Sequence, residues 1–257
     1  MAITDVMLFF APWIWPLVAA PFAGSFLGVV VRRLPDRRAL LLARSECENC
    51  GRVLRPWELV PIVSWLTLRG RCSACRAGIG TFYPLVELAA VLVALGPILV
   101  SPTDATWLWT SCGLGWTLLA LGWIDWERYQ LPDVVTLPLI LAGLVVTSIL
   151  NLGALADRAV ATAAGYASLQ LLNAGYRRLR GYDGLGQGDA KLFAACGAWT
   201  GLAALPFVLL LGALAGLGIA ALRAFSGETL SRQTRIPFGT CLAFALWVEW
   251  LTAGVVA

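Results

Sequence analysis

Long apolar stretches separated by short polar turns occupy most of the chain. They lie at residues 7–31, 83–101, 106–124, 134–151, 159–176, 191–205, 206–222 and 236–256. A helix needs roughly 20 apolar residues to cross a bilayer, and these stretches lack the period-two alternation of barrel strands. The pattern therefore predicts an all-α polytopic membrane protein with about eight transmembrane helices.

The interval between Lys191 and Arg223 is the least regular part of this pattern. Its 31 apolar residues would extend about 47 Å as one helix, which is too long for one crossing and short for two. We expect a hairpin of abbreviated helices, broken near Gly201 and Pro206. Such broken segments usually line a cavity instead of facing lipid.

Composition and charge give the same class and add an orientation. The chain is 59% hydrophobic and 13% charged, whereas soluble domains have about 25% charged residues. With polar segments 32–82, 125–133, 177–191 and 223–235 on one side, that side holds 18 of the 19 Lys and Arg residues. The positive-inside rule makes it cytoplasmic. Basic residues spread along a membrane rim favour anionic lipid headgroups as partners, and no nucleic acid.

The polar segment 32–82 contains two CxxC pairs, Cys47/Cys50 and Cys72/Cys75, with 21 residues between them. This spacing suits a structural four-cysteine zinc site, and a metal would stabilise a segment too small for a large hydrophobic core. Redox-active or disulfide-bonded pairs, and cysteines without metal, are the alternatives. We expect a first transmembrane helix over 1–31, a cytoplasmic zinc-binding domain over 32–82 and a transmembrane core over 83–257.

The chain has no histidine, which excludes Ser-His-Asp triads and His-ligated metals. Lys191, the only lysine, could form a Ser–Lys dyad, but a helix-end lysine usually extends to the interface. Asp125 and Asp189 are better candidates because both lie where apolar segments meet the cytoplasmic side. Glu87 and Glu249 fall inside apolar stretches, where a carboxylate needs a partner.

Helix packing could bring Asp125 and Asp189 together. Two close carboxyl groups do not both ionise readily, so one would activate water while the other polarises an amide carbonyl. Gly184, Gly186 and Gly188, before Asp189, either permit close backbone approach or form a flexible turn with Asp189 as helix N-cap. Both interpretations remain open on the local pattern.

An ordered series of motifs resembles the type IV prepilin peptidases. The series is GSFLGVVVRRLP (24–35), the CxxC pairs, ELVPIVSWLTLRGRCSAC (58–75), FYPLVELAA (82–90), IDWERYQLPDVVTLPL (124–139), GLGQGDAKL (184–192) and IPFGTCLA (236–243). The resemblance implies that Asp125 and Asp189 are the catalytic pair of a GxGD-type membrane aspartyl protease. Asp133 is then a secondary site residue or a helix cap.

The resemblance further implies a substrate, a cofactor and a location. Enzymes of this family cleave the leader of prepilins or type II secretion pseudopilins after a glycine, at the cytoplasmic side of the bacterial inner membrane. They then methylate the new N-terminus with S-adenosylmethionine. The chain departs from the family at Glu48, where proline is usual, and at Gly28, where asparagine is usual. A peptidase without methylation and a non-enzymatic transporter or scaffold are the alternatives.

Overall fold

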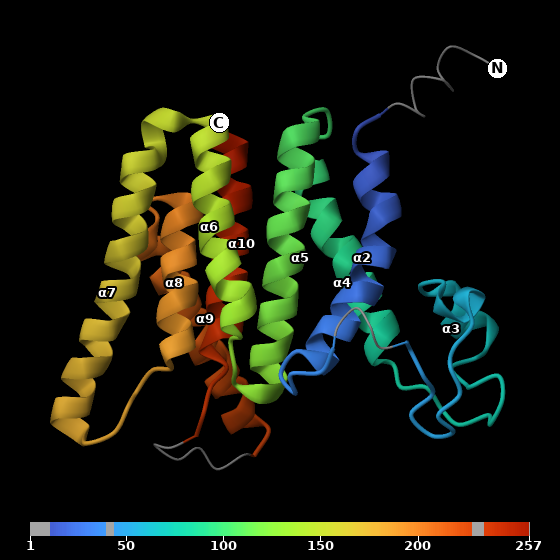
Figure 1. The fold of residues 1–257 in the computed structure, drawn as a ribbon. Coiled ribbons are helices and arrows are strands. Elements are labelled where there is room, and N and C mark those ends of the chain that lie inside the picture. The colour runs from blue at the N-terminus through green and yellow to red at the C-terminus, as the bar shows by residue number, and fades with distance from the viewer. Residues whose placement is uncertain (1–10, 40–43, 228–233, 257) are drawn as a thin grey trace. The chain divides into compact units, whose positions relative to one another are not determined.

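The computed structural model describes residues 11–39, 44–227 and 234–256, and all their extended regular structure is helical (Figure 1). The longer helices are α2 (Ile14–Arg33), α4 (Phe82–Val100), α5 (Ala105–Arg128), α6 (Asp133–Leu150), α7 (Leu155–Arg180), α8 (Gln187–Thr200), α9 (Leu205–Phe225) and α10 (Phe238–Val256). Shorter elements are η1 (Pro56–Leu59), α3 (Val63–Thr67) and η2 (Leu152–Ala154). The helical class and the approximate helix positions predicted from the sequence are confirmed.

Four of the described helices are long and apolar enough to cross a membrane: α2, α4, α6 and α9, of 18 to 21 residues. A shorter apolar segment covers Phe238–Gly254 in α10. The remaining long helices are α5, α7, α8 and α10, and a membrane crossing by each of them, which would make eight, stays a prediction. Residues 7–10 of the first predicted segment lie outside the described residues.

The chain divides into two compact units, residues 1–120 and 121–257. In the first unit α2 packs against α4, and the indole N–H of Trp116 in α5 donates to the carbonyl of Ala90 at 2.9 Å. The small lobe that contains η1, α3 and the two CxxC pairs also belongs to this unit (Figure 1).

The second unit is built around α8, which packs against α6, α7, α9 and α10. Its residues Ala190 and Leu192–Trp199 are buried. A Cβ on Gly197 would lie 2.4 Å from the Ala161 backbone, and one on Gly165 would lie 2.8 Å from the Phe193 carbonyl oxygen. These two pairs define an antiparallel register between α7 and α8, in which glycine permits backbone contact.

The chain breaks between α8 and α9, as the apolar pattern predicted. Gly201 has a φ of +88°, and Pro206 lies in the first turn of α9. The expectation of two abbreviated helices is correct for α8, with 14 residues, and wrong for α9, with 21. The difference arises because the interval divides unequally: only residues 192–200 of it belong to α8, whereas α9 has 18 residues from Leu205 before it reaches Arg223.

Candidate aspartyl site and metal centre

Asp125 lies near the C-terminal end of α5 and is 5% exposed. Its Oδ2 accepts the backbone N–H of Thr240 at 2.8 Å and lies 3.2 Å from the Thr240 hydroxyl. That hydroxyl is also 2.8 Å from the carbonyl oxygen of Gly122, one turn earlier in α5. The first turn of α10 therefore holds one oxygen of Asp125 in place and leaves the other without these donors.

Asp189 is the third residue of α8, and its Oδ2 accepts the backbone N–H of Gly186 at 3.1 Å. The residue is half-buried and close enough to Asp125 for their charges to interact. Asp189 thus bonds across the helix start while Gly186 occupies the N-cap position. The structure brings together the two carboxyl groups that lie 64 residues apart in the sequence.

Leu131 packs between two glycines next to the aspartates. A Cβ added to either Gly188 or Gly239 would come within 2.8 Å of Leu131 side-chain atoms. Glycine at both positions leaves room for the leucine. The loop after α5, the glycine-rich loop before α8 and the start of α10 consequently meet at one place.

Asp133 and Lys191 form an ion pair beside these loops. Lys191 Nζ lies 2.6 Å from Asp133 Oδ1, and Asp133 is the first residue of α6. The Lys191 side chain is 23% exposed. This ion pair connects α8 to α6 and occupies the ammonium group of Lys191, and its extension to the membrane interface stays a prediction.

The glycine-rich loop is attached to α7 by an asparagine. Asn173 Oδ1 accepts the N–H groups of Gly184 and Leu185 at 2.9 and 3.0 Å, while its amide nitrogen donates to Asp183 at 3.0 Å. The ring of Tyr176 packs against Gly184. These contacts restrain a loop that the sequence alone left open as a flexible turn.

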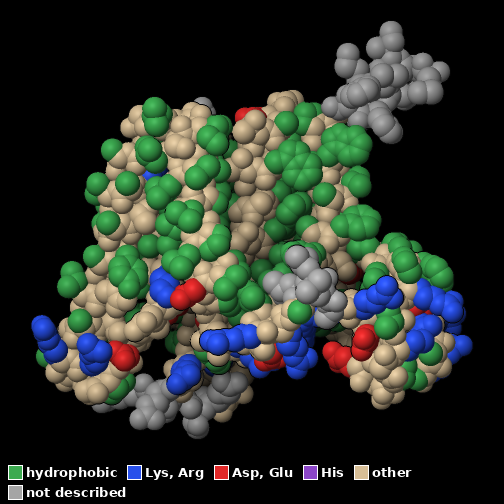
Figure 2. All heavy atoms as spheres, in the orientation of Figure 1, with side chains coloured by type: hydrophobic (Ala, Val, Ile, Leu, Met, Phe, Trp, Pro, Cys, Tyr) green, Lys and Arg blue, Asp and Glu red, His purple; other side chains and the backbone are tan. Residues whose placement is uncertain are grey.

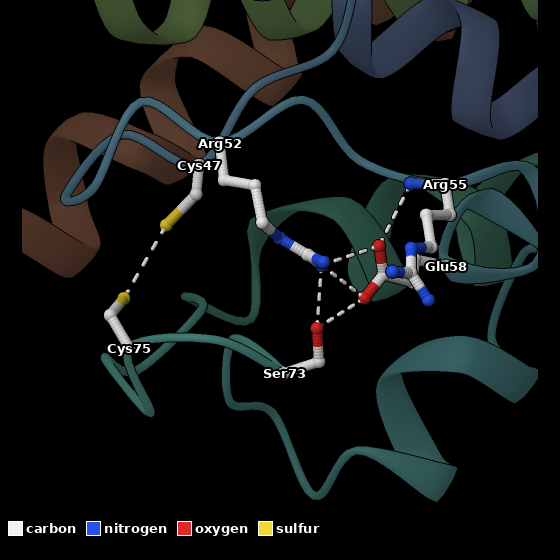
Figure 3. Close-up of polar contacts among 6 residues, drawn as sticks. All are labelled: Cys47, Arg52, Arg55, Glu58, Ser73 and Cys75. Carbon is white, nitrogen blue, oxygen red and sulfur yellow. Dashed lines mark hydrogen bonds and ion pairs between the residues drawn. The ribbon is translucent and has the colours of Figure 1, made fainter.

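The four cysteines of the CxxC pairs form a compact cluster in the small lobe. Their sulfur atoms all lie within 4.8 Å of one another, and Cys47 and Cys75 face each other at 3.8 Å (Figure 3). A tetrahedral zinc ion with Zn–S bonds of about 2.3 Å separates its sulfur ligands by about 3.8 Å. All four are free thiols. The predicted clustering is confirmed, and the donor set fits a metal ion.

The two CxxC turns have the same backbone design. Gly51 N–H donates to the Cys47 carbonyl at 2.8 Å, and Arg76 N–H donates to the Cys72 carbonyl at 3.0 Å. Gly51 and Arg76 both have positive φ, at 68° and 60°. The N–H of Ala77 is the main cause that lowers the pKa of Cys75, to about 6. A sulfur held as thiolate is the form that binds metal.

A buried carboxylate joins the two turns (Figure 3). Arg52, just after the first pair, contacts both Glu58 carboxylate oxygens at 2.5 and 2.7 Å, and Ser73, between the second pair, donates to Glu58. The Glu58 side chain is 5% exposed. The backbone N–H of Arg55, then Ser73 and Arg52, lower the pKa of Glu58 to about 2. Glu58 thus holds the two turns together without contacting a sulfur.

Comparison with known proteins assigns the family. Residues 18–100 match the Bacterial Peptidase A24 N-terminal domain, and residues 112–221 match the Type IV leader peptidase family. The chain belongs to the type IV leader peptidase family. This match confirms the resemblance inferred from the motifs.

Relatives within this family cover most of the chain. The chain is 38% identical to the prepilin leader peptidase/N-methyltransferase of Burkholderia pseudomallei, over 88% of this chain and 81% of the relative. Identity is 39% to the protein of the same name in Pseudomonas aeruginosa, with 89% and 86% covered. It is 36% to that of Aeromonas salmonicida, with 93% and 91% covered. No solved structure matches the chain.

Two residues that contact the candidate aspartyl site or its glycine-rich loop were not identified from the sequence. Thr240 lies in the motif IPFGTCLA, but its contact with Asp125 spans 115 residues. Asn173 lies in α7 outside any of the motifs, and only the fold brings it to Gly184 and Leu185. Glu87 does have a partner, the N–H of Ile62 at 2.7 Å, and Glu249 is half-buried in α10.

Proposed function

We propose that this protein is a prepilin peptidase in which Asp125 and Asp189 form the catalytic pair. The observation that carries the proposal is the meeting of the two carboxyl groups beside the first turn of α10. The substrate would be the leader of a type IV prepilin or a type II secretion pseudopilin, cut after a glycine. The names of the relatives support a prepilin leader, and the pseudopilin and the glycine follow from the motif resemblance.

The hydrogen bonds divide the roles within the pair. The N–H of Thr240, with its hydroxyl nearby, stabilises the negative charge of Asp125, so Asp125 is the ionised member. Its proximity disfavours a second charge, so Asp189 holds the proton. The geometry of the pair is then that of a general base beside a general acid.

Hydrolysis proceeds in two steps. Asp125 takes a proton from water as the water oxygen bonds to the amide carbon, while Asp189 donates a hydrogen bond to the carbonyl oxygen. The intermediate collapses when the amide nitrogen receives a proton from the pair and the C–N bond breaks. The first step needs Asp125 as proton acceptor and Asp189 as hydrogen-bond donor, and the second returns the proton taken from water to the leaving nitrogen.

The second activity is methylation of the new N-terminal amine. S-adenosylmethionine would supply the methyl group: its methyl–sulfur bond would break as the bond to the amine nitrogen forms, and the amine would lose a proton. The proposal rests on the relatives' name, N-methyltransferase. We also propose that the chain consists of a first transmembrane helix over 1–31, a zinc-binding domain over 32–82 and a peptidase core over 83–257.

The metal proposed for the cysteine cluster is structural zinc, bound by Cys47, Cys50, Cys72 and Cys75. Four thiolate ligands leave no open coordination position for water, so the ion supplies folding energy to the lobe. We also propose that this lobe and both aspartates face the cytoplasm and that the protein resides in the bacterial inner membrane. The Arg-rich side of the charge pattern supports that orientation.

Charge-removing variants test the proposed chemistry. Asp125→Asn and Asp189→Asn keep side-chain size, so each should abolish leader cleavage of a prepilin in vesicles while the protein level is unchanged. Asp104→Asn is the matched control, since Asp104 accepts the N–H of Trp107 at the start of α5 and asparagine caps helices equally well. Mature pilin formed by either dyad variant would refute the aspartyl mechanism.

Mass spectrometry of the cleaved pilin separates the remaining alternatives. An N-terminus heavier by one methyl group is expected when S-adenosylmethionine is supplied. Cleaved but unmethylated pilin would indicate a peptidase alone. An intact leader with the wild-type protein would favour a transporter or scaffold.

A further inference from the structure

A hydrogen bond to Glu87 holds part of the small lobe, which contains the four cysteines, at a defined position along α4. This helix has 19 residues, a length of about 28 Å, close to the roughly 30 Å of a hydrocarbon core. Glu87 lies five residues after the first residue of α4, and therefore about 7.5 Å along the helix. Its carboxylate accepts the backbone N–H of Ile62 at 2.7 Å. The segment around Ile62 consequently lies alongside the first turns of a membrane-spanning helix, beyond its polar end.

The backbone at Ile62 is constrained to this position. Ile62 has φ of 60° and ψ of −52°, and Val63 N–H donates to the Pro61 carbonyl at 2.5 Å. This is a γ-turn of the strained kind, which is rare for a β-branched residue. Such a conformation persists only where its surroundings hold it. The bond from Glu87, itself 5% exposed, supplies that restraint.

Large apolar side chains surround this turn and are exposed. They are Trp57, Leu59, Val60, Val63 and Leu66, with exposed fractions of 62, 43, 38, 55 and 60%. We call them the 57–66 apolar cluster. Leu85, Leu88 and Leu92 of α4 are also exposed, on other faces of that helix than Glu87. Figure 2 shows hydrophobic side chains and arginines side by side on the lobe that holds α3.

Arginines adjoin the cluster at both ends. The Arg55 guanidinium lies 5.3 Å from the ring centre of Trp57, and Arg69 follows α3 with an exposed side chain. An apolar surface flanked by cations is the composition of segments that lie in the boundary between anionic headgroups and acyl chains. Tryptophan is itself enriched at this boundary.

We propose that the 57–66 apolar cluster inserts into the headgroup–hydrocarbon boundary of the bilayer that α4 crosses. The depth set by Glu87, the exposed apolar side chains and the flanking arginines identify lipid as the occupant. Arg55 and Arg69 contact lipid phosphates at the rim of the inserted surface. The lobe is then a membrane-embedded element on a fixed attachment, independent of whether the protein cleaves prepilins.

Photo-crosslinking in a bilayer tests this placement. The full chain would carry benzoylphenylalanine in place of Val63 or Leu66, in vesicles of phosphatidylethanolamine and phosphatidylglycerol. The matched control places the probe at Ala74, an exposed residue of the second CxxC turn outside the cluster. We expect about tenfold more phospholipid adduct from positions 63 and 66 than from 74, since interfacial segments bury their apolar face in acyl chains.

Bound zinc, measured for each variant, verifies that the lobe is folded. Equal lipid adducts at all three positions, or none at 63 and 66 in folded protein, would overturn the proposal. Adding a prepilin peptide tests whether a substrate, instead of lipid, contacts the 57–66 apolar cluster. Adducts at 63 and 66 that shift from lipid to the peptide would make the cluster a substrate-docking surface and would also refute lipid insertion.

Discussion

Gly239→Ala offers the sharpest test of how Asp125 is held. A Cβ at this position would lie 3.0 Å from Asp125 Cγ and 2.8 Å from Leu131 Cδ1, whereas ordinary contacts begin near 3.4 Å. The leucine can rotate away because it is the end of a flexible side chain. Asp125 cannot, because Thr240 holds its Oδ2 at 2.8 Å. The substitution therefore displaces the carboxyl group by about 0.4 Å at constant charge.

The size of the effect follows from that displacement. A misplacement of about 1 Å costs roughly a hundredfold in rate, so about 0.4 Å should cost nearly tenfold. Tenfold corresponds to about 1.4 kcal/mol of transition-state stabilisation. Alanine is favoured over glycine by up to about 1 kcal/mol in a helix, which offsets part of the crowding cost to folding. We therefore expect kcat to fall about tenfold with little change in Tm.

Gly122→Ala is the matched control for this change. Gly122 faces the same threonine, but its added Cβ would meet nothing closer than 3.7 Å. Both variants should be assayed for prepilin cleavage in vesicles, with Tm measured on the same samples. Gly239→Ala protein with wild-type kcat would refute the positional argument. Equal losses in both variants would show general disruption of the contact between α5 and α10.

Three further changes test other contacts. Thr240→Val keeps the backbone N–H on Asp125 but removes the hydroxyl, so kcat should fall by about threefold to tenfold, and Thr240→Ser should restore it at unchanged KM. Cys72→Ser, or a strong chelator, should release zinc and expose the cysteine lobe to protease, with bound metal and cleavage pattern as readouts. Glu58 should stabilise the lobe fully above its ordinary pKa of 4.5, with the benefit lost as pH falls toward about 2. The difference in lobe stability between wild type and Glu58→Gln should shrink over that interval, and a constant difference would contradict the assignment.

The helical framework could be predicted because hydrocarbon imposes a strong pattern. Apolar runs of membrane length identify helices, and charged residues such as Arg128 and Lys191 show where they approach water. The same rule was less exact at α9, which ends two residues after Arg223, at Phe225. A charge marks proximity to the interface, and a helix can continue beyond it.

The cysteine cluster could also be predicted, because paired CxxC turns carry their own geometry. The carboxylate that joins those turns could not. Arg52, Glu58 and Ser73 are ordinary polar residues of a loop, and only folding brings them together.

The same distinction applies to the aspartates. Asp125 and Asp189 could be identified as candidate site residues from the sequence. A carboxylate near hydrocarbon has a high free-energy cost, and both residues lie in the family motifs. Thr240 and Asn173 could not be identified in this way, since each acts through contacts between segments that no local pattern connects. The role of each residue depends on which atoms of a distant segment the fold places beside it.

The register between α7 and α8 fixes the level along α7 at which Asp189 lies. With Gly165 beside Phe193 and Ala161 beside Gly197, the same register places Asp189 level with Leu169. From that level α7 continues for 11 residues to Arg180, a rise of about 16 Å. An extended peptide spans at most about 3.3–3.6 Å per residue, so it needs about five residues to cover that rise. Under the proposed aspartyl mechanism, a leader shorter than this would not reach from the level of Arg180 to Asp189, so leader length would itself contribute to substrate selection.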